Sequence, residues 1–397
     1  AVHSAASWAG VWNAPHPADA GLRHELQDEL DAKDDFVKEF LSWIPDGGFP
    51  FPAILFDPLK LRAIAAEGSA KAAGGDDWRP ADLAKLPLPW WECFAKLMEC
   101  ITRSGKCPRA WAQIIVALLD KEDGSQRPLS IAGAMWRIGV TCIVRQLAPW
   151  IEKWAPLELA GGLPDRTAAY IHARLAHDFD SKTAHQHIGA IFEDLSKAFD
   201  NVDVGQCLAI WRRLGAPYSL LQLIRDFYRK AKRLFSCKGW CSPEWIHALH
   251  SLLQGCPFST ILLGALMACW VKHVQAAVPE VRIGVFVDDR SLWAVGPQQH
   301  LVLTRALDAS RAFDQKFSCQ LNVDKTQLLG NTARARADLA AATATVGLGQ
   351  KHPTNKGKLL GLCYHFCEDS LRVTLDPKAV TKCRQRLDLI KHVASSL

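Results

Sequence analysis

Two acidic stretches decide how this chain folds: Phe192-Glu-Asp-Leu-Ser-Lys-Ala-Phe-Asp200 and Val281-Arg-Ile-Gly-Val-Phe-Val-Asp-Asp289. Each contains a short run rich in apolar and β-branched residues, at 188–192 and 281–287. Such runs predict buried strands. Both runs end directly at carboxylates, so we expect two strands that deliver acidic side chains at their ends.

Asp194 follows the first run, and Asp288 and Asp289 close the second. If the two strands are neighbours in one sheet, the three carboxylates meet within a few ångströms. Unpaired anions at such distances raise one another's pKa, and divalent cations relieve this repulsion. An Asp-Asp pair is also common in plain hairpin turns, so the pair alone leaves a structural interpretation open.

The rest of the chain alternates between strand and helix patterns around these two stretches. Apolar periodicity predicts helices over 24–43, 87–103, 204–214, 220–231, 258–277, 301–317 and 377–393, a strand over 112–119 and a hairpin over 234–249. This order predicts an α+β fold whose antiparallel sheet has helices on one face.

Composition favours a globular protein that binds a polyanion. The 397 residues are 49% hydrophobic and 22% charged, which excludes collagen, coiled coil and general disorder. The longest apolar run, Ile261–Val271, has eleven residues against the roughly 20 that a bilayer requires, so no membrane partner is expected. Residues 1–100 carry 9 Lys and Arg against 16 Asp and Glu, and the remainder 38 against 25. The basic part is the expected place for nucleic acid, although a solvated basic surface has the same composition.

The thirteen cysteines are spread through segments that look like core helices and strands. This distribution favours reduced thiols and an intracellular location, in the cytoplasm or nucleus. The pairs Cys237/Cys241 and Cys363/Cys367 leave zinc open as an alternative to packed thiols.

Taken in order, the motifs resemble those of reverse transcriptases, most closely the enzymes of non-LTR (LINE-type) retrotransposons. The acidic stretches are similar to the D-x-x-x-A-F-D and Y-A-D-D motifs of that family. Further similar segments are Asp120-Lys-Glu-Asp-Gly to Arg127-Pro-Leu-Ser130, Gly161-Gly-Leu-Pro-Asp-Arg166, Gln254-Gly-Cys-Pro-Phe-Ser259, Leu321-Asn-Val-Asp-Lys-Thr326 and Lys358-Leu-Leu-Gly361. They cover about residues 107–361, so the N-terminal hundred residues lie outside the resemblance.

The resemblance implies a right-hand polymerase in which a two-metal site joins deoxynucleotides to a primer. Asp194, Asp288, Asp289 and the Leu195 carbonyl would hold two Mg²⁺ ions, with Mn²⁺ as an alternative. The resemblance further implies nucleotide contacts from Lys121, Arg127, Leu195, Phe199, Gln254 and Lys325, and template or primer contacts from Gly255, Pro257, Ser259, Leu360 and Gly361. Phe199 falls at the steric-gate position, where a bulky ring would exclude a ribose 2′-hydroxyl. A core aromatic on a strand-to-helix turn is the alternative for Phe199, and without the surrounding motifs the two basic residues at 121 and 127 would be solvated surface.

Two departures from the family pattern stand near the acidic pair. Phe286 and Val287 replace Tyr and Ala, and Arg290 follows directly after the pair, where we expect it to place a cation beside the metals. Neither departure removes a metal ligand.

The predicted layout is an extension of unknown role over 1–79, fingers over 80–187 with a segment returning after Leu214, palm over 188–356 and the start of a thumb over 357–397. The implied function is RNA-directed DNA polymerase, with an RNA template, a DNA or RNA primer and deoxynucleoside triphosphates as partners. A catalytically decayed, nucleic-acid-binding relic and an RNA-dependent RNA polymerase remain the alternatives. The oligomeric state cannot be inferred from the sequence.

Overall fold

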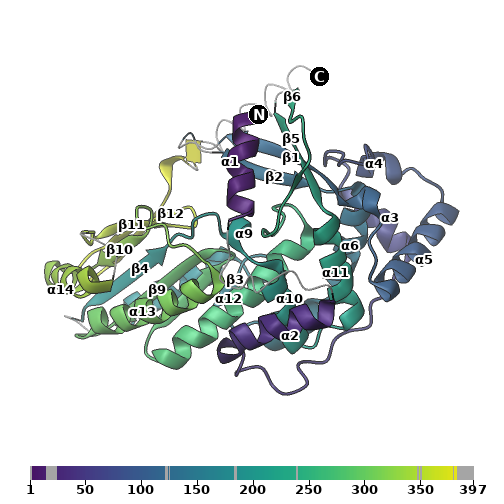
Figure 1. The fold of residues 1–397 in the computed structure, drawn as a ribbon. Helices are drawn as coiled ribbons and strands as arrows, with labels where there is room; N and C mark the ends of the chain where they lie inside the picture. Colours follow the sequence, from purple (N-terminus) through teal and green to yellow (C-terminus); the bar gives the residue numbers. More distant parts are fainter. Residues whose placement is uncertain are drawn as a thin grey trace.

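The computed structural model describes residues 2–14, 25–120, 124, 126–182, 186–237, 240–346, 348, 351–378 and 380–381. In this part of the chain the strands form three sheets, surrounded by helices (Figure 1). The predicted thumb helix over 377–393 lies largely outside the described residues, so it stays a prediction.

The palm sheet carries both acidic stretches. Its strands, in spatial order, are β10 (Gln327–Gly330), β4 (Ile188–Glu193), β9 (Asp289–Val295), β8 (Arg282–Phe286) and β3 (Leu159–Ala160). Every residue of β4 is buried, as a strand covered on both faces requires. The three pairs β10–β4, β4–β9 and β9–β8 are antiparallel, as predicted, whereas the short edge strand β3 runs parallel to β8. Sequence patterns missed β3 and β10 because two- and four-residue strands carry too little periodicity to detect.

Helices cover both faces of the palm sheet, so the expectation of helices on one face is wrong. The first face packs against α12 (Pro257–Ala277), α13 (Gln299–Phe317) and α14 (Ala333–Thr343), the last leading into η3 (Ala344–Val346). On the second face, α8 (Ala168–Asp180) shares a separate hydrophobic cluster with the small sheet of β11 (Lys356–Leu359), β12 (Leu362–Phe366) and β13 (Leu371–Leu375).

The central helix α12 is long and apolar enough to span a membrane, but 78% of its most apolar stretch is buried inside the protein. Pro257 opens the helix at its first turn, where the missing N–H has no intrahelical partner to lose. Burial on all sides is the packing expected of a core helix, and it explains the continuous apolar run seen in the sequence.

A second sheet forms beside the palm. Strand β1 (Gln113–Asp120) pairs antiparallel with β2 (Gln126–Ile131) and parallel with β5 (Lys232–Cys237), which in turn pairs with β6 (Trp240–Cys241) and β7 (Ile246–His247). Strand β5 reaches this sheet from the palm through α9 (Ala198–Asn201), α10 (Val204–Arg213) and α11 (Tyr218–Lys230). Helix α11 and strand β5 follow Leu214, where we expected a segment to return to the fingers, and the assignment of this sheet to the fingers stays a prediction. The helical elements before and beside the sheet are α3 (Pro58–Glu67), α4 (Pro80–Leu83), α5 (Leu88–Ser104), η2 (Arg109–Ala112), α6 (Ala134–Gln146) and α7 (Ala148–Trp154).

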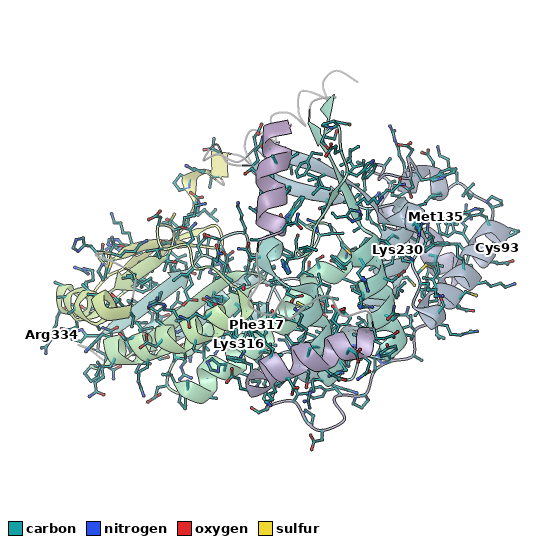
Figure 2. All side chains as sticks on the ribbon, in the orientation of Figure 1. Cys93, Met135, Lys230, Lys316, Phe317 and Arg334 are labelled. Atoms are coloured by element: carbon teal, nitrogen blue, oxygen red, sulfur yellow. The ribbon has the colours of Figure 1, made fainter. Side chains whose placement is uncertain are left out.

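The N-terminal residues pack along the helices that flank the palm sheet. The predicted helix over 24–43 appears as α2 (Leu26–Val37) followed by η1 (Lys38–Phe40), and α2 lies against α10. Figure 2 places Lys316 and Phe317 at the end of α13, where the Phe40 ring lies 5.4 Å from the Phe317 ring and Lys316 lies 3.7 Å from Glu39. The separate helix α1 (Val2–Trp12) stands beside β5 and above α9 (Figure 1).

A buried ion-pair network fixes the alignment of β4 with β9. Glu193 faces Arg290 in the register of these strands, and the Arg290 Nε lies 2.7 Å from the Glu193 carboxylate. The two terminal nitrogens of Arg290 each donate a 2.7 Å hydrogen bond to Asp314 of α13. Burial alone lowers the pKa of Arg290, but Asp314 and Glu193 outweigh burial and raise it. The network therefore keeps the Arg290 guanidinium charged inside the core, where the carboxylates of Glu193 and Asp314 offset its charge.

This network overturns the expected place of Arg290. Successive side chains of a strand point to opposite faces, so Arg290 points away from the face reached by Asp289. Its side chain is fully buried and its guanidinium lies 4.7 Å from the centre of the Trp270 ring, on the α12 side of the sheet. The arginine is a structural cation beneath the acidic residues and is not beside the proposed metals.

We predict that Arg290→Met lowers the free energy of unfolding by about 3–5 kcal/mol, because it leaves Glu193 and Asp314 buried without their cation. Arg305→Met is the matched control, since Arg305 pairs with Glu280 at 3.2 Å while both side chains are more than half exposed. Breaking this surface pair should change stability by about 1 kcal/mol or less. Urea unfolding of both variants measures the difference, and equal losses would contradict the assignment.

Candidate active site

The three predicted carboxylates come together at one end of the palm sheet. Phe286 pairs with Asp289, so Val287 and Asp288 form a two-residue turn between β8 and β9. Asp194 directly follows β4, and continuing the register of Glu193 with Arg290 places it opposite Asp289. Val287 adopts φ 60°, a left-handed conformation that a β-branched residue rarely takes. Backbone strain of this kind is concentrated at functional sites.

The electrostatics of Asp289 reflect its acidic surroundings. Burial, and after it the charges of Asp288 and Asp194, together raise the pKa of Asp289 to about 7, while Arg127 opposes the rise. Among the described residues, Arg127 of the second sheet is thus a cation whose charge acts on this cluster.

The backbone of Asp194 is held by a segment whose role we did not predict. The Asn322 N–H donates to the Asp194 carbonyl at 2.7 Å, and the Asp194 N–H donates to the Thr326 hydroxyl at 3.4 Å. Both belong to the L-N-x-x-K-T motif, from which only Lys325 had been singled out. Asn322 and Thr326 flank the turn of this motif, and Asn and Thr commonly form hydrogen bonds with nearby backbone. Their residue types were therefore the signal from which the sequence could have predicted this contact.

The Leu195 carbonyl remains available as a metal ligand. Leu195 and Leu321 form an isolated antiparallel bridge, and its two hydrogen bonds use the backbone of the neighbouring residues Asp194 and Ser196. In such a pair the central residues direct their own N–H and C=O away from each other. The Leu195 carbonyl therefore points to the side on which β9 lies.

Arg127 is the predicted triphosphate ligand that the structure brings to the site. It is exposed on β2, where it pairs with Leu119, and its charge reaches Asp289. Lys121, predicted to act with it, lies outside the described residues.

The loop before α12 links the palm to the second sheet. Gln254 is half-buried, and its carbonyl accepts a 2.7 Å hydrogen bond from the Ser130 N–H of β2. Gly255 has φ +118°, and a Cβ there would lie 2.4 Å from the Ser130 carbonyl oxygen. Only glycine fits a position with both constraints. Phe199 is half-buried near this loop, and its carbonyl accepts from the Leu252 N–H at 2.7 Å.

The remaining predicted residues differ in accessibility. Ser259 is 1% exposed, and its hydroxyl donates to the Leu253 carbonyl and contacts the Tyr228 hydroxyl at 2.9 Å. Its hydroxyl therefore holds the loop before α12, and the template or primer contact that the motif implied stays a prediction. Pro257 is half-buried at the start of α12, and its predicted template or primer contact also stays a prediction.

Lys325 is exposed in the turn before β10. Leu360 and Gly361 form the turn between β11 and β12, with φ 48° and 83°. Leu360 packs against the hydrophobic cluster on the second face of the palm, which Phe286 also joins. The predicted primer contacts thus lie in a hairpin turn rather than within a strand.

The donor set fits a hard divalent cation. Carboxylates and one backbone carbonyl are the ligands that Mg²⁺ and Mn²⁺ prefer, and a bound cation would oppose the rise in the pKa of Asp289 that burial and the two neighbouring acids cause. Among the described residues, no group of three or more His, Cys, Asp or Glu is gathered closely enough to hold a metal alone. Mg²⁺ commonly completes its shell with water and substrate phosphates, so a preformed cage is not required. The same observation gives no support to zinc at Cys363 and Cys367, which are free thiols, whereas the side chain of Cys237 lies outside the described part of the chain, so zinc at Cys237/Cys241 stays untested.

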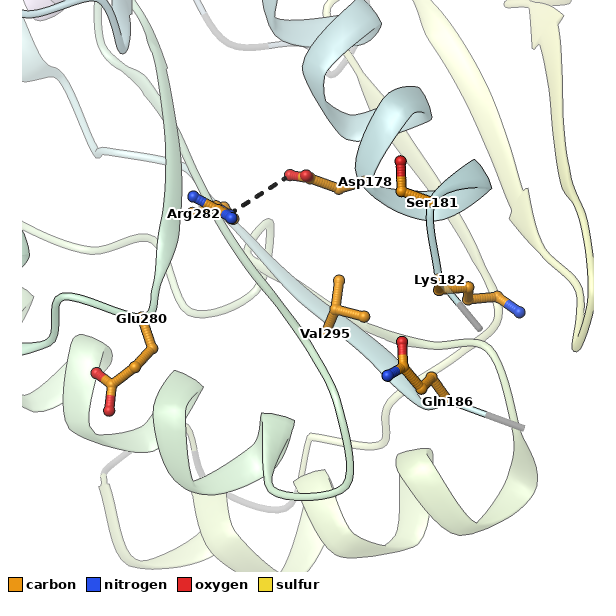
Figure 3. A pocket seen from close by; sticks show the side chains of 7 residues that line it. All are labelled: Asp178, Ser181, Lys182, Gln186, Glu280, Arg282 and Val295. Atoms are coloured by element: carbon orange, nitrogen blue, oxygen red, sulfur yellow. Dashed lines mark ion pairs between the residues drawn. The ribbon is translucent and has the colours of Figure 1, made fainter. Parts of the chain in front are cut away.

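A small pocket of about 190 Å³ lies at the other end of the palm sheet (Figure 3). Arg282 at the start of β8 and Val295 at the end of β9 line it, and Arg282 pairs with Asp178 at 3.9 Å. The seven residues of β9 span about 20 Å, so this pocket is remote from the carboxylates.

Residues 119–362 match the reverse transcriptase (RNA-dependent DNA polymerase) family. The chain belongs to this family. The match contains all three carboxylates, Arg127 and the loop before α12, and it confirms the resemblance inferred from the motifs. The predicted α+β class is confirmed as well. The boundaries of fingers, palm and thumb stay predictions.

Two curated proteins are similar to this reverse transcriptase chain over 51% of its length. One is the Retrovirus-related Pol polyprotein from type-1 retrotransposable element R2 of Nasonia vitripennis, with 27% identity over 224 residues. The other is the Retrovirus-related Pol polyprotein from type-2 retrotransposable element R2DM of Drosophila melanogaster, with 25% identity over 214 residues. The chain spans only 21% and 19% of their lengths. The solved structure of apo telomerase from Candida tropicalis, truncated from its C-terminal domain, is similar over 73% of this chain and 61% of its own, with 11% identity and a TM-score of 0.49.

We predict that Asp289→Asn stabilises the metal-free protein. A carboxyl with a raised pKa favours the folded state while protonated, so its contribution is lost as pH rises from about 4 through about 7. Asparagine cannot ionise and avoids this loss. Thermal unfolding in a chelator should therefore give a higher Tm for the variant at pH 8 and a vanishing difference towards pH 4.

Asp308→Asn, at an exposed position of α13, is the control for this measurement. A surface exchange of this kind should shift stability by no more than about 0.5 kcal/mol at either pH. An Asp289→Asn variant less stable than the wild type at pH 8 would contradict the crowding of the three acids.

Proposed function

We propose that this chain is an RNA-directed DNA polymerase that extends a DNA or RNA primer with deoxynucleotides on an RNA template. The observation that carries the proposal is the meeting of Asp194, Asp288 and Asp289 at one end of the palm sheet, facing Arg127. Clustered anions would weaken a module that only binds nucleic acid, since they repel phosphates. Their combination with a cation from the second sheet suits phosphoryl transfer.

The chain's own side chains would bind and orient the reactants. Arg127 would hold the incoming triphosphate through its planar fork of donors, with Lys121 and Lys325 as further phosphate contacts. Phe199 would stand against the sugar, and Gln254 with Gly255 would support the template base. The Leu360–Gly361 turn would contact the primer. Each group positions a reactant, which is where most of the rate enhancement in phosphoryl transfer originates.

Asp194, Asp288, Asp289 and the Leu195 carbonyl would hold two Mg²⁺ ions, with Mn²⁺ as an alternative. When bound, these ions would stabilise negative charge on the attacking and leaving oxygens. Metal loading would also neutralise the acids that raise the pKa of Asp289.

Template and primer binding should rest on phosphate contacts, so it should weaken steeply with salt and depend little on sequence. The R2 names of the relatives support a retrotransposon origin. An intracellular site of action, in the cytoplasm or nucleus, remains part of the proposal.

The test is extension of a DNA primer on an RNA template with Mg²⁺ and deoxynucleotides. We expect extension by the wild type and a loss of about a thousandfold or more in Asp288→Asn/Asp289→Asn, because removing both acids removes the metal ligands. The Arg305→Met variant is the matched control, since it alters a charge far from the site. No extension, with salt-sensitive hybrid binding retained, would favour the relic. Extension with ribonucleotides alone would favour an RNA polymerase.

Phe199→Ala tests the choice of sugar. Removing the ring should raise ribonucleotide incorporation relative to deoxynucleotide incorporation by about tenfold or more, since a steric block of this kind is worth at least about 1.4 kcal/mol. Single-nucleotide incorporation with matched dNTP and rNTP measures the ratio. An unchanged ratio would assign Phe199 to packing alone.

A further inference from the structure

The end of helix α1 is anchored inside the polymerase core by one tryptophan. Trp12 is fully buried, and its indole N–H donates a 2.8 Å hydrogen bond to the Asp200 Oδ1. Its ring stacks on Phe235 of β5 at 5.4 Å, and the Arg233 guanidinium lies 4.0 Å from the ring centre. These contacts join α1 to the last residue of the first acidic motif.

The second carboxylate oxygen of Asp200 binds Gln254. The Gln254 Nε2 donates to the Asp200 Oδ2 at 2.8 Å. An ionised carboxylate only accepts hydrogen bonds, so the amide must turn its NH₂ group towards Asp200. This fixes the direction of the amide oxygen and hence the face that Gln254 presents to a template base.

The hydrogen bonds that link Trp12, Asp200 and Gln254 are called the relay below, and further hydrogen bonds hold the backbone around it. The Ser251 N–H donates to the Val202 carbonyl at 3.0 Å, and the His250 N–H donates to the Trp12 carbonyl at 3.1 Å. Buried Arg233 donates to the Ser251 hydroxyl at 3.1 Å. Burial raises the pKa of Asp200, while Trp12, Arg233 and Gln254 oppose the rise. The loop carrying Gln254 is thus tied both to α1 and to the acidic motif.

We propose that Trp12 is a positioning residue for polymerisation: through Asp200 it sets the orientation of the Gln254 amide against the template strand. The inference rests on the proposed function of Gln254. It assigns a role to residues 2–12, which lie outside the matched region 119–362. The N-terminal helix then contributes to the accuracy of nucleotide selection without touching the substrate.

Trp12→Phe is the sharpest variant, because it keeps an aromatic ring on Phe235 while it removes the N–H donor, and the loss of ring size that accompanies it is matched in the control below. We expect about a tenfold lower kcat/KM for the correct deoxynucleotide and a smaller preference over mismatched ones, in line with the loss of a hydrogen bond to a charged group. Trp8→Phe is the control, since Trp8 lies 5.9 Å from Trp12 on the same helix and takes no part in the hydrogen bond to Asp200.

A double-mutant cycle separates positioning from general weakening. If Trp12 acts through Gln254, the Trp12→Phe effect should disappear in a Gln254→Ala background. Effects that multiply in the double mutant, or a Trp12→Phe variant as active and selective as the wild type, would overturn the proposal. If Trp12→Phe does not fold, Asp200→Asn tests the same relay, since it keeps the size and alters the acceptors. A wild type that extends no primer would instead overturn the proposed function, and the inference with it.

Discussion

The alignment of β4 with β9 depends on the buried pairing of Arg290 with Glu193 and Asp314. A sheet buried on both faces has few means to fix its register except the match of its side chains, and a one-residue slip would reverse the faces of every residue. A slip here would leave three charges buried without partners. The ion pairs therefore specify the register that places Asp194 opposite Asp289. The charge that stabilises the fold and the charges that would bind metal sit on opposite faces of the same two strands.

The surrounding elements hold the remaining site residues largely through backbone contacts. Asn322 and Thr326 fix the Asp194 backbone, and Ser130 fixes the loop of Gln254. Each contact joins segments far apart in sequence, so the site exists only in the complete fold. The N-terminal residues belong to this assembly, because α1 and α2 bury side chains against the polymerase core.

The sequence was sufficient for the carboxylates and the strands that carry them, because apolar runs ending in Asp are local signals. The sequence was insufficient to predict where the Arg290 side chain lies, because local sequence does not show which face of a strand packs against a buried acid. It also could not find the relay from Trp12 to Asp200 and Gln254, whose members are separated by 188 and 54 residues. The sequence also did not show that the Ser259 hydroxyl is buried and bonded to the Leu253 carbonyl, because this contact forms only when the loop before α12 is folded. The short strands β3 and β10 exist because of their neighbours in the sheet and have no pattern of their own.

The close approach of Gly255 to Ser130 has a mechanical consequence. The Ser130 N–H is bonded to Gln254, and its carbonyl leaves no space even for a methyl group at Gly255. The two sheets cannot separate at this point without breaking that contact. Strand β2 and the loop of Gln254 are therefore held together as one unit at Ser130. Arg127 lies three residues earlier on β2, about 10 Å away, so the strand itself sets the position of Arg127 relative to that loop.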